Sequence, residues 1–486
     1  MAVQGLNALQ VSYAKSWSGL TTENHLYAIY QRDPQLVSDI VTEIFNRKGY
    51  FGLDNFLSKY PTKMLDHDGE YRWMLKGDSR RAINIVGFTS AANTAVGKPG
   101  LNQEIFYLEL EERHFQVSDY LIFDDRDFGV RIVDEGYANG TNWVYGVQSM
   151  NPADGAFIPA SLMTVGRKVS RQNNIVTNTL NDEYSQPQFT SHFEMRNVFS
   201  TLSKEQVVPG NMHNTPLLIK MNAGDGQPVT TWTRWQDIET ELQWRREKAN
   251  QLMFSQFNQR ANGQFANKSR NGFVIKQGAG LRQQISPSYK FYYTTLTLDY
   301  LHEVAQNLSI NILPEDQREF LILTGERGMY MFSKLIEDKV AVFNPMGNPD
   351  RLIGSGSNLG FRGQYKVFEG YNGIKYTVMH MPEYDDVIDN RLVHPDGGYT
   401  ENYRMTIMNI GTTNGEPNIQ KMGVKGRTDM KWYVAGSTSP YGPNYSGSGG
   451  SEIDGYKIMY QTTQGIMLKN PLSACELIPS VNTPEY

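Results

Sequence analysis

The sequence has almost no cysteine, no long apolar run and no excess of positive charge. Cys475 is the one cysteine, which excludes an internal disulfide and argues against a disulfide-stapled secreted scaffold. No stretch approaches the ~18 apolar residues of a membrane-spanning helix, and the first residues lack the charged and apolar regions of a signal peptide. We therefore expect a chain that is neither exported nor membrane-bound and that is stabilised by packing or assembly.

The charge balance excludes one large class of function. Lys and Arg number 46 and Asp and Glu number 51, for a net charge of −5, and neither half of the chain has a basic run of the kind that binds phosphates. Dedicated nucleic-acid binding is therefore not expected. Aromatic residues make up 12%, led by 28 Tyr, and supply large buried areas. A length of 486 residues predicts about three compact units.

No motif for nucleotide binding is complete. The phosphate-cradling loop needs two glycines and a final Ser or Thr, and Gly97-Lys98 lacks the first glycine and the hydroxyl residue. The dinucleotide pattern is half-matched at Gly278 and Gly280, but Gln283 stands in place of its third glycine. We interpret this segment as a loop or bend.

The sequence also lacks the catalytic motifs of metalloproteases, serine hydrolases and thiol enzymes. His302-Glu303 is not followed by the second histidine of a zinc site. Residues 354–357 do not give the G-x-S-x-G nucleophile elbow. Cys475 has no basic neighbour in sequence, and we interpret it as a small buried packing residue.

Two groups of acidic residues have the composition of a site. The first group, at 380–396, has the carboxylate and imidazole density of a divalent-cation site. The second group, at 124–135, supplies carboxylates for general acid–base catalysis of the glycosidase kind. Solvated loops and strand ends explain the same residues, and we take that interpretation for both. The groups are His380, Glu383, Asp385, Asp386, Asp389, His394 and Asp396, and Asp124, Asp125, Asp127, Asp134 and Glu135.

The order of predicted elements along the chain is distinctive. An extended arm precedes a helix from Asp33 to Gly49, and a strand-rich block follows from about 71 to 208, with a β-subdomain at about 100–166. The longest helical pattern in the chain runs over 231–261 and reads as a spine. An α+β part follows, with helices at 297–307 and 325–338, strands at 319–323, 364–368 and 375–379, a Gly/Ser/Tyr-rich loop at 436–450, and a last strand pair at 456–460 and 465–468.

This order resembles the major capsid proteins of tailed phages of the Hong Kong 97 type. Four segments sharpen the resemblance toward the capsid proteins of crAss-like phages of gut bacteria: 278–285 (GAGLRQQI), 320–336 (FLILTGERGMYMFSKLI), 464–472 (QGIMLKNPL) and 475–479 (CELIP). The resemblance spans essentially the whole chain. It implies an α+β fold of the Hong Kong 97 type with an inserted β-subdomain.

The resemblance also implies a division into domains. Its parts are an N-terminal arm at 1–65, an E-loop region at 66–215 with the inserted subdomain at about 100–166, a P-domain at 216–285 with spine helix 231–261, an A-domain at 286–454 and returning P-domain strands at 455–486.

The implied function is structural. The resemblance implies a shell subunit and no enzyme, with no catalytic, cofactor or metal residues, assembled in the bacterial host cytoplasm and located in the virion. The implied partners are its own copies in hexamers and pentamers, portal, scaffolding and head auxiliary proteins, and double-stranded DNA enclosed without specific binding. Two alternatives stay open, a carbohydrate-active or glycan-binding β-rich protein and a tail- or portal-associated structural protein.

Overall fold

The computed structural model describes most of the chain beyond the arm. The described residues are 52–58, 60–77, 79–90, 97–179, 186–210, 216–222, 228–309, 318–343, 365–369, 374–413, 415–443 and 450–480. They fall into two compact units, one of Met1–Trp73 with Arg196–Tyr486 and one of Met74–Met195. The helix expected at 33–49 and most of the expected arm at 1–65 lie outside the described residues.

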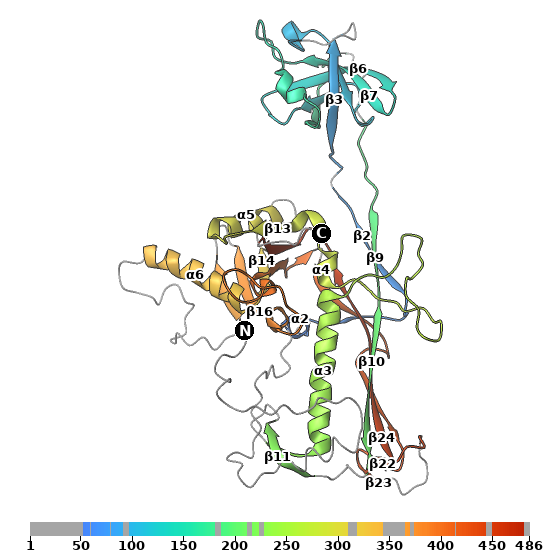
Figure 1. Cartoon of the computed structure of the whole chain (residues 1–486). Coiled ribbons are helices and arrows are strands. Elements are labelled where there is room, and N and C mark those ends of the chain that lie inside the picture. The colour runs from blue at the N-terminus through green and yellow to red at the C-terminus, as the bar shows by residue number, and fades with distance from the viewer. Residues whose placement is uncertain are drawn as a thin grey trace. The chain divides into compact units, whose positions relative to one another are not determined.

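A six-stranded sheet forms the centre of the first unit (Figure 1). It mixes parallel and antiparallel pairs: β14 is parallel to β16 and antiparallel to β17. Helices and strands within one unit confirm the α+β class predicted from the sequence. In order across the sheet, the strands are β13 (Lys290–Tyr293), β25 (Ala474–Pro479), β17 (Met405–Asn409), β14 (Glu319–Thr324), β16 (Lys375–His380) and β15 (Tyr365–Glu369).

This sheet is buried on both faces, as its central strand shows. Successive side chains of a strand point to opposite faces, and in β14 Leu321 and Leu323 join one core cluster while Phe320 and Ile322 join another. A strand covered on both sides reads as a continuous apolar run. Helices α2 (Gly52–Leu57), α3 (Trp232–Phe254) and α4 (Leu281–Gln284) supply the first cluster, and α5 (Leu298–Ser309) and α6 (Glu326–Phe343) supply the second.

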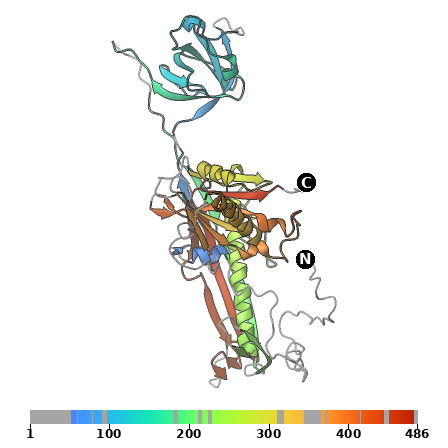
Figure 2. The same ribbon diagram turned by 90° about the vertical axis from the view of Figure 1, so that its left-hand side faces the viewer.

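The long helix α3 lies along a long antiparallel ribbon of β10 (Ser200–Pro209) and β24 (Gly455–Leu468), as both views show (Figures 1 and 2). Trp244 of the helix packs on Tyr460 of β24 with 6.0 Å between ring centroids. Lys204 of β10 forms a 2.7 Å ion pair with Glu247 of the helix. The 23 residues of α3 span about 35 Å, and the ribbon supports the helix over that length.

Two sequence predictions in this region were wrong in extent. The spine helix was expected to run to 261, but α3 ends at Phe254. Tertiary hydrogen bonds replace the next helical turn, because the carbonyl of Ser255 accepts from the amide of Gly280 at 2.7 Å. The strand pair expected at 456–460 and 465–468 is one continuous strand, β24. Gly465 does not interrupt it; a Cβ there would lie 2.6 Å from the Tyr71 hydroxyl, so this glycine makes room for a tyrosine.

The remaining strands of the first unit complete the ribbon's sheet or form small pairs. The order β1-β20-β24-β10, with β21 also paired to β24, builds a five-stranded sheet. These strands are β1 (Lys63–Leu65), β20 (Ile419–Val424) and β21 (Met430–Ala435), and the two-stranded pairs are β2 (Glu70–Leu75) with β9 (Phe193–Val198), β11 (Pro216–Asn222) with β12 (Pro228–Thr231), β18 (Thr412–Thr413) with β19 (Glu416–Pro417) and β22 (Thr438–Ser439) with β23 (Gly442–Pro443).

The second unit is a closed barrel with strand order β3-β4-β7-β6-β5-β8. The residues 100–166, where the sequence predicts a β-subdomain, lie within it. Its interior is filled by a separate cluster that includes Phe106, Leu108 and Tyr145, so the barrel is a packed core. The strands are β3 (Ala82–Ser90), β4 (Phe106–Leu110), β5 (Asp119–Ile122), β6 (Gly129–Asn139), β7 (Asn142–Ser149) and β8 (Lys168–Asn174).

A buried tyrosine ties a loop to the inside of this barrel. The hydroxyl of Tyr145 accepts hydrogen bonds from the amides of His114 and Phe115 at 2.9 and 3.1 Å and donates to the carbonyl of Phe115 at 3.2 Å. Burial raises the pKa of this hydroxyl above its ordinary value, so it stays protonated and able to donate.

Tyr145→Phe should lower the free energy of unfolding of the barrel by about 1–3 kcal/mol, because it leaves two amides without their acceptor. Hydrogen exchange of the amides in β4 and β7 measures this loss. Tyr107→Phe is the matched control, since the Tyr107 hydroxyl has no hydrogen bond within the described residues. Equal exchange rates in the two variants would contradict the role given to Tyr145.

Candidate functional site

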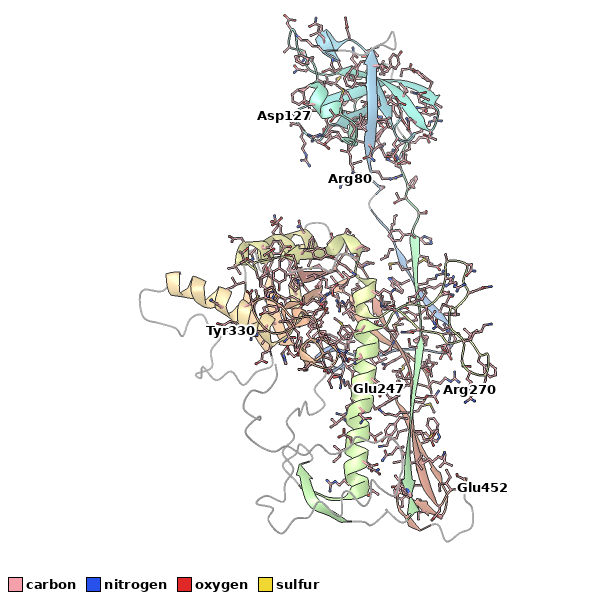
Figure 3. The ribbon with its side chains drawn as sticks, viewed as in Figure 1. Arg80, Asp127, Glu247, Arg270, Tyr330 and Glu452 are labelled. Carbon is pink, nitrogen blue, oxygen red and sulfur yellow. The ribbon has the colours of Figure 1, made fainter. Side chains whose placement is uncertain are left out.

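The carboxylates at 124–135 do not form a catalytic pair. Asp124 accepts from Arg167 at 3.2 Å, and Glu135 is ion-paired with Arg113. Asp134 accepts from the backbone amide of Gly136. Within the described part of the barrel, no hydrogen bond or ion pair brings two of these carboxylates onto one partner, and Figure 3 shows Asp127 on the outside of the barrel. Nothing here favours the carbohydrate-active alternative.

The acidic and imidazole residues at 380–396 are structural contacts. His380 pairs with Asp385, whose carboxylate accepts from the amide of Glu326 at 3.0 Å. This places a negative charge at the N-terminus of α6, where the helix dipole favours it. Arg246 of α3 pairs with Asp386. The described residues contain no group of three or more His, Cys, Asp or Glu side chains arranged to hold a metal ion.

The half-matched glycine pattern serves close backbone packing. A Cβ on Gly278 would lie 2.0 Å from the carbonyl oxygen of Val198, and one on Gly280 would lie 2.7 Å from that of Met253. The side chain of Ser255 donates to the carbonyl of Gly278 at 2.7 Å. These glycines let the chain leaving α3 pass directly against two other backbones, which is the loop interpretation made from the sequence.

The two single-residue candidates have ordinary structural roles. Cys475 is fully buried in β25, and burial raises the pKa of its thiol, which opposes formation of a nucleophilic thiolate. The Nδ1 atom of His302 lies 3.2 Å from the hydroxyl of Tyr376.

Within the described residues of the first unit, two arginines and two glutamates form a partly buried network. Arg282 of α4 contacts Glu476 of β25 at 2.7 Å and Glu401 at 3.3 Å. Arg404 contacts the same two carboxylates at 2.8 and 3.0 Å. Each charge therefore has two partners of opposite sign. The side chain of Glu476 is 1% exposed, and a charge so buried needs this compensation.

Burial and charge act in opposite directions on Arg282. Burial by itself lowers the pKa of the guanidinium, but the negative charges of Glu401 and Glu476 hold that pKa above its ordinary value. Tyr384 lies beside the network, and burial raises the pKa of its hydroxyl. That hydroxyl lies 2.6 Å from the hydroxyl of Thr406. Arg282 therefore stays charged, and its neighbouring tyrosine is neutral.

The network joins the ribbon to the six-stranded sheet. Gln284 also belongs to α4, two residues after Arg282. Its side chain donates to the carbonyl of Ile466 and accepts from the amide of Leu468, and both of these residues lie in β24. One short helix therefore holds β24 through Gln284 and β25 through Arg282. Sequence reasoning did not single out these charges as a site, although Glu476 between the apolar residues Cys475 and Leu477 is a detectable signal of a buried carboxylate.

The fold places the chain in the α+β class. Its charge network connects elements that lie far apart in the sequence. The model of the Crassvirus major capsid protein family matches residues 4–482. The major capsid protein of Bacteroides phage crAss001 is 30% identical over 98% of this chain and 99% of its own length. The chain belongs to the Crassvirus major capsid protein family, whose members are virion proteins of crAss-like phages.

Solved structures give distant likenesses. The capsid of a native GTA particle is 8% identical and covers 95% of this chain and 100% of its own, with a TM-score of 0.33. The capsid of Cyanophage P-SCSP1u is 11% identical and covers 63% of this chain and 82% of its own, with a TM-score of 0.31. These values are too low to add to the family assignment.

In the described residues, no helix is long and apolar enough to cross a membrane.

Glu476→Gln should lower the free energy of unfolding of the first unit by about 3–5 kcal/mol, because it leaves two partly buried guanidinium groups with half their compensating charge. Urea denaturation of the unassembled chain, followed by circular dichroism, measures this change.

The matched control is Glu319→Gln. Glu319 pairs with Lys375 at 3.5 Å, and both side chains are about half exposed, so its loss should cost less than about 1 kcal/mol. Similar midpoints for the two variants would show that the network is not a main support of the fold.

Proposed function

We propose that this chain is the shell subunit of a phage head. Copies of it self-assemble into a closed icosahedral shell that encloses the genome. The observation that carries the proposal is the family match over residues 4–482. The described residues add support, because their buried polar groups bind elements of the chain to one another and leave no catalytic arrangement among the candidates considered above.

The proposal includes a domain division of the Hong Kong 97 type. Support comes from α3 lying along the β10–β24 ribbon, from a separate sheet with helices on both faces, and from a barrel inserted between β2 and β9. The proposed parts are an arm at 1–65, an E-loop region with the barrel at 66–215, a P-domain at 216–285 and 455–486, and an A-domain at 286–454.

The proposed partners are those that a subunit of a phage head shell would contact. They are other copies of the chain in hexamers and pentamers, a portal, scaffolding and head auxiliary proteins, and double-stranded DNA held without specific contacts. The net charge of −5 fits weak attraction between the shell and phosphate. We propose no enzymatic activity and no cofactor, and assembly in the cytoplasm of the bacterial host.

Negative-stain microscopy and size measurement of the full chain, produced alone and together with the products of neighbouring genes, tests this proposal. Closed polyhedral particles are the expected result, because arms and loops that bury little alone become ordered against neighbouring copies. Rings or tubes would favour the tail- or portal-associated role instead. A monomer under every condition would contradict a structural shell.

A further inference from the structure

Residues 256–277, here called the basic loop, form an ordered excursion from the first unit with an unusual composition. The loop follows α3 directly. It contains Arg260, Lys268, Arg270 and Lys276 and no Asp or Glu. The whole chain carries −5, so the rest of the chain carries −9 against the +4 of this loop. Figure 3 shows Arg270 at the far end of the excursion.

The basic loop is held in one conformation by its own backbone. Two tight turns close at glycines with positive φ: Gly263 donates to the carbonyl of Arg260 at 2.9 Å, and Gly272 donates to that of Ser269 at 2.9 Å. The side chain of Asn258 bonds the carbonyl of Ile275. At its base, Gln259 donates to Glu70 of β2 at 2.8 Å. The surface of the loop is therefore preformed, which reduces the entropy lost when a partner binds.

The charges and the apolar side chains of the loop both face solvent. Arg260, Lys268 and Arg270 have no hydrogen bond or ion pair from their side chains within the described residues, and all three are exposed. An apolar run, Phe273, Val274 and Ile275, lies between Arg270 and Lys276. Its side chains are 73%, 52% and 45% exposed. Contiguous exposed apolar residues mark an interaction surface.

We propose that the basic loop is an assembly contact that docks on an acidic, partly apolar surface of a second copy of this chain. The charges are complementary, because each copy carries −9 outside its loop. The apolar run favours protein over nucleic acid, since aromatic residues and Arg are enriched in protein interfaces, whereas binding to phosphates needs only the cations. This inference rests on the proposed shell function, which supplies the second copy.

Reversing three loop charges together tests the contact. The full chain with Arg260→Glu, Lys268→Glu and Arg270→Glu should give at least about tenfold fewer closed particles, because reversal places like charges in the interface. These side chains are exposed and make no described contacts, so the melting temperature of the unassembled chain should not change. The matched control reverses Arg126, Lys168 and Lys334, which are exposed and likewise make no described polar contact.

The outcomes separate this inference from the proposal on which it rests. Particles from the wild type and the control, but not from the loop variant, support the contact. A normal yield of closed particles from the loop variant overturns it, and if those particles hold less DNA than wild-type particles, the loop binds nucleic acid instead. A wild type that never forms particles overturns the shell function and this inference with it.

A crosslinking experiment tests the contact directly. Asn271 is exposed at the second turn, and the native Cys475 is fully buried, so Asn271→Cys adds the one accessible thiol of the described residues. A benzophenone attached there should crosslink two copies of the chain in particles and give no such product in the unassembled chain. Mass spectrometry should map the second site to an acidic segment. Crosslinks to DNA, or none between copies, would overturn the proposal.

Discussion

The burial of one carboxylate, Glu476, constrains much of the first unit. A charge with almost no exposure is tolerable only with close partners of opposite sign. Those partners are Arg282 of α4 and Arg404, which follows the short helix Thr400–Tyr403 just before β17. The two arginines would repel each other without Glu401, which contacts both. Satisfying one charge thus fixes two separate segments, α4 and residues 401–404, against the six-stranded sheet. Because α4 also bonds β24 through Gln284, the same requirement sets where the long ribbon meets that sheet.

The long helix depends on its surroundings in a different way. Helices are stabilised mainly by tertiary packing, and α3 carries many charged residues, so its contacts with β10 and β24 decide its position. Lys204 and Glu247 tie β10 to the helix, and Gln464 of β24 donates to the carbonyl of Lys248 at 3.1 Å. The helix ends where the chain meets the glycine segment at 278–280. Tertiary contacts therefore determine both the support and the length of this element.

The sequence predicted local periodicity well and long-range polar contacts poorly. The helix expected at 297–307 is α5 at Leu298–Ser309, and the strand expected at 319–323 is β14 at Glu319–Thr324, because apolar spacing reports the buried face directly. The end of α3 was missed because the competing bonds come from residues more than twenty positions away. The charge network was missed because Arg282 and Glu476 are almost two hundred positions apart. The acidic groups were interpreted as solvated loop and strand-end residues, but Asp134 and Glu135 lie within β6 and Asp386 is buried beside Arg246, contacts that are visible only in three dimensions.

The closed barrel has a consequence for how such a chain can be rebuilt. Its first strand pairs with its last, with Ala82 opposite Ser170, so the chain enters and leaves the barrel at neighbouring points. A module with adjacent ends can be removed, replaced or exchanged between relatives at two cuts without rethreading the host chain. The barrel can therefore be replaced as a unit. A foreign domain with similarly spaced ends, such as an antigen or a binding module, can be inserted in its place.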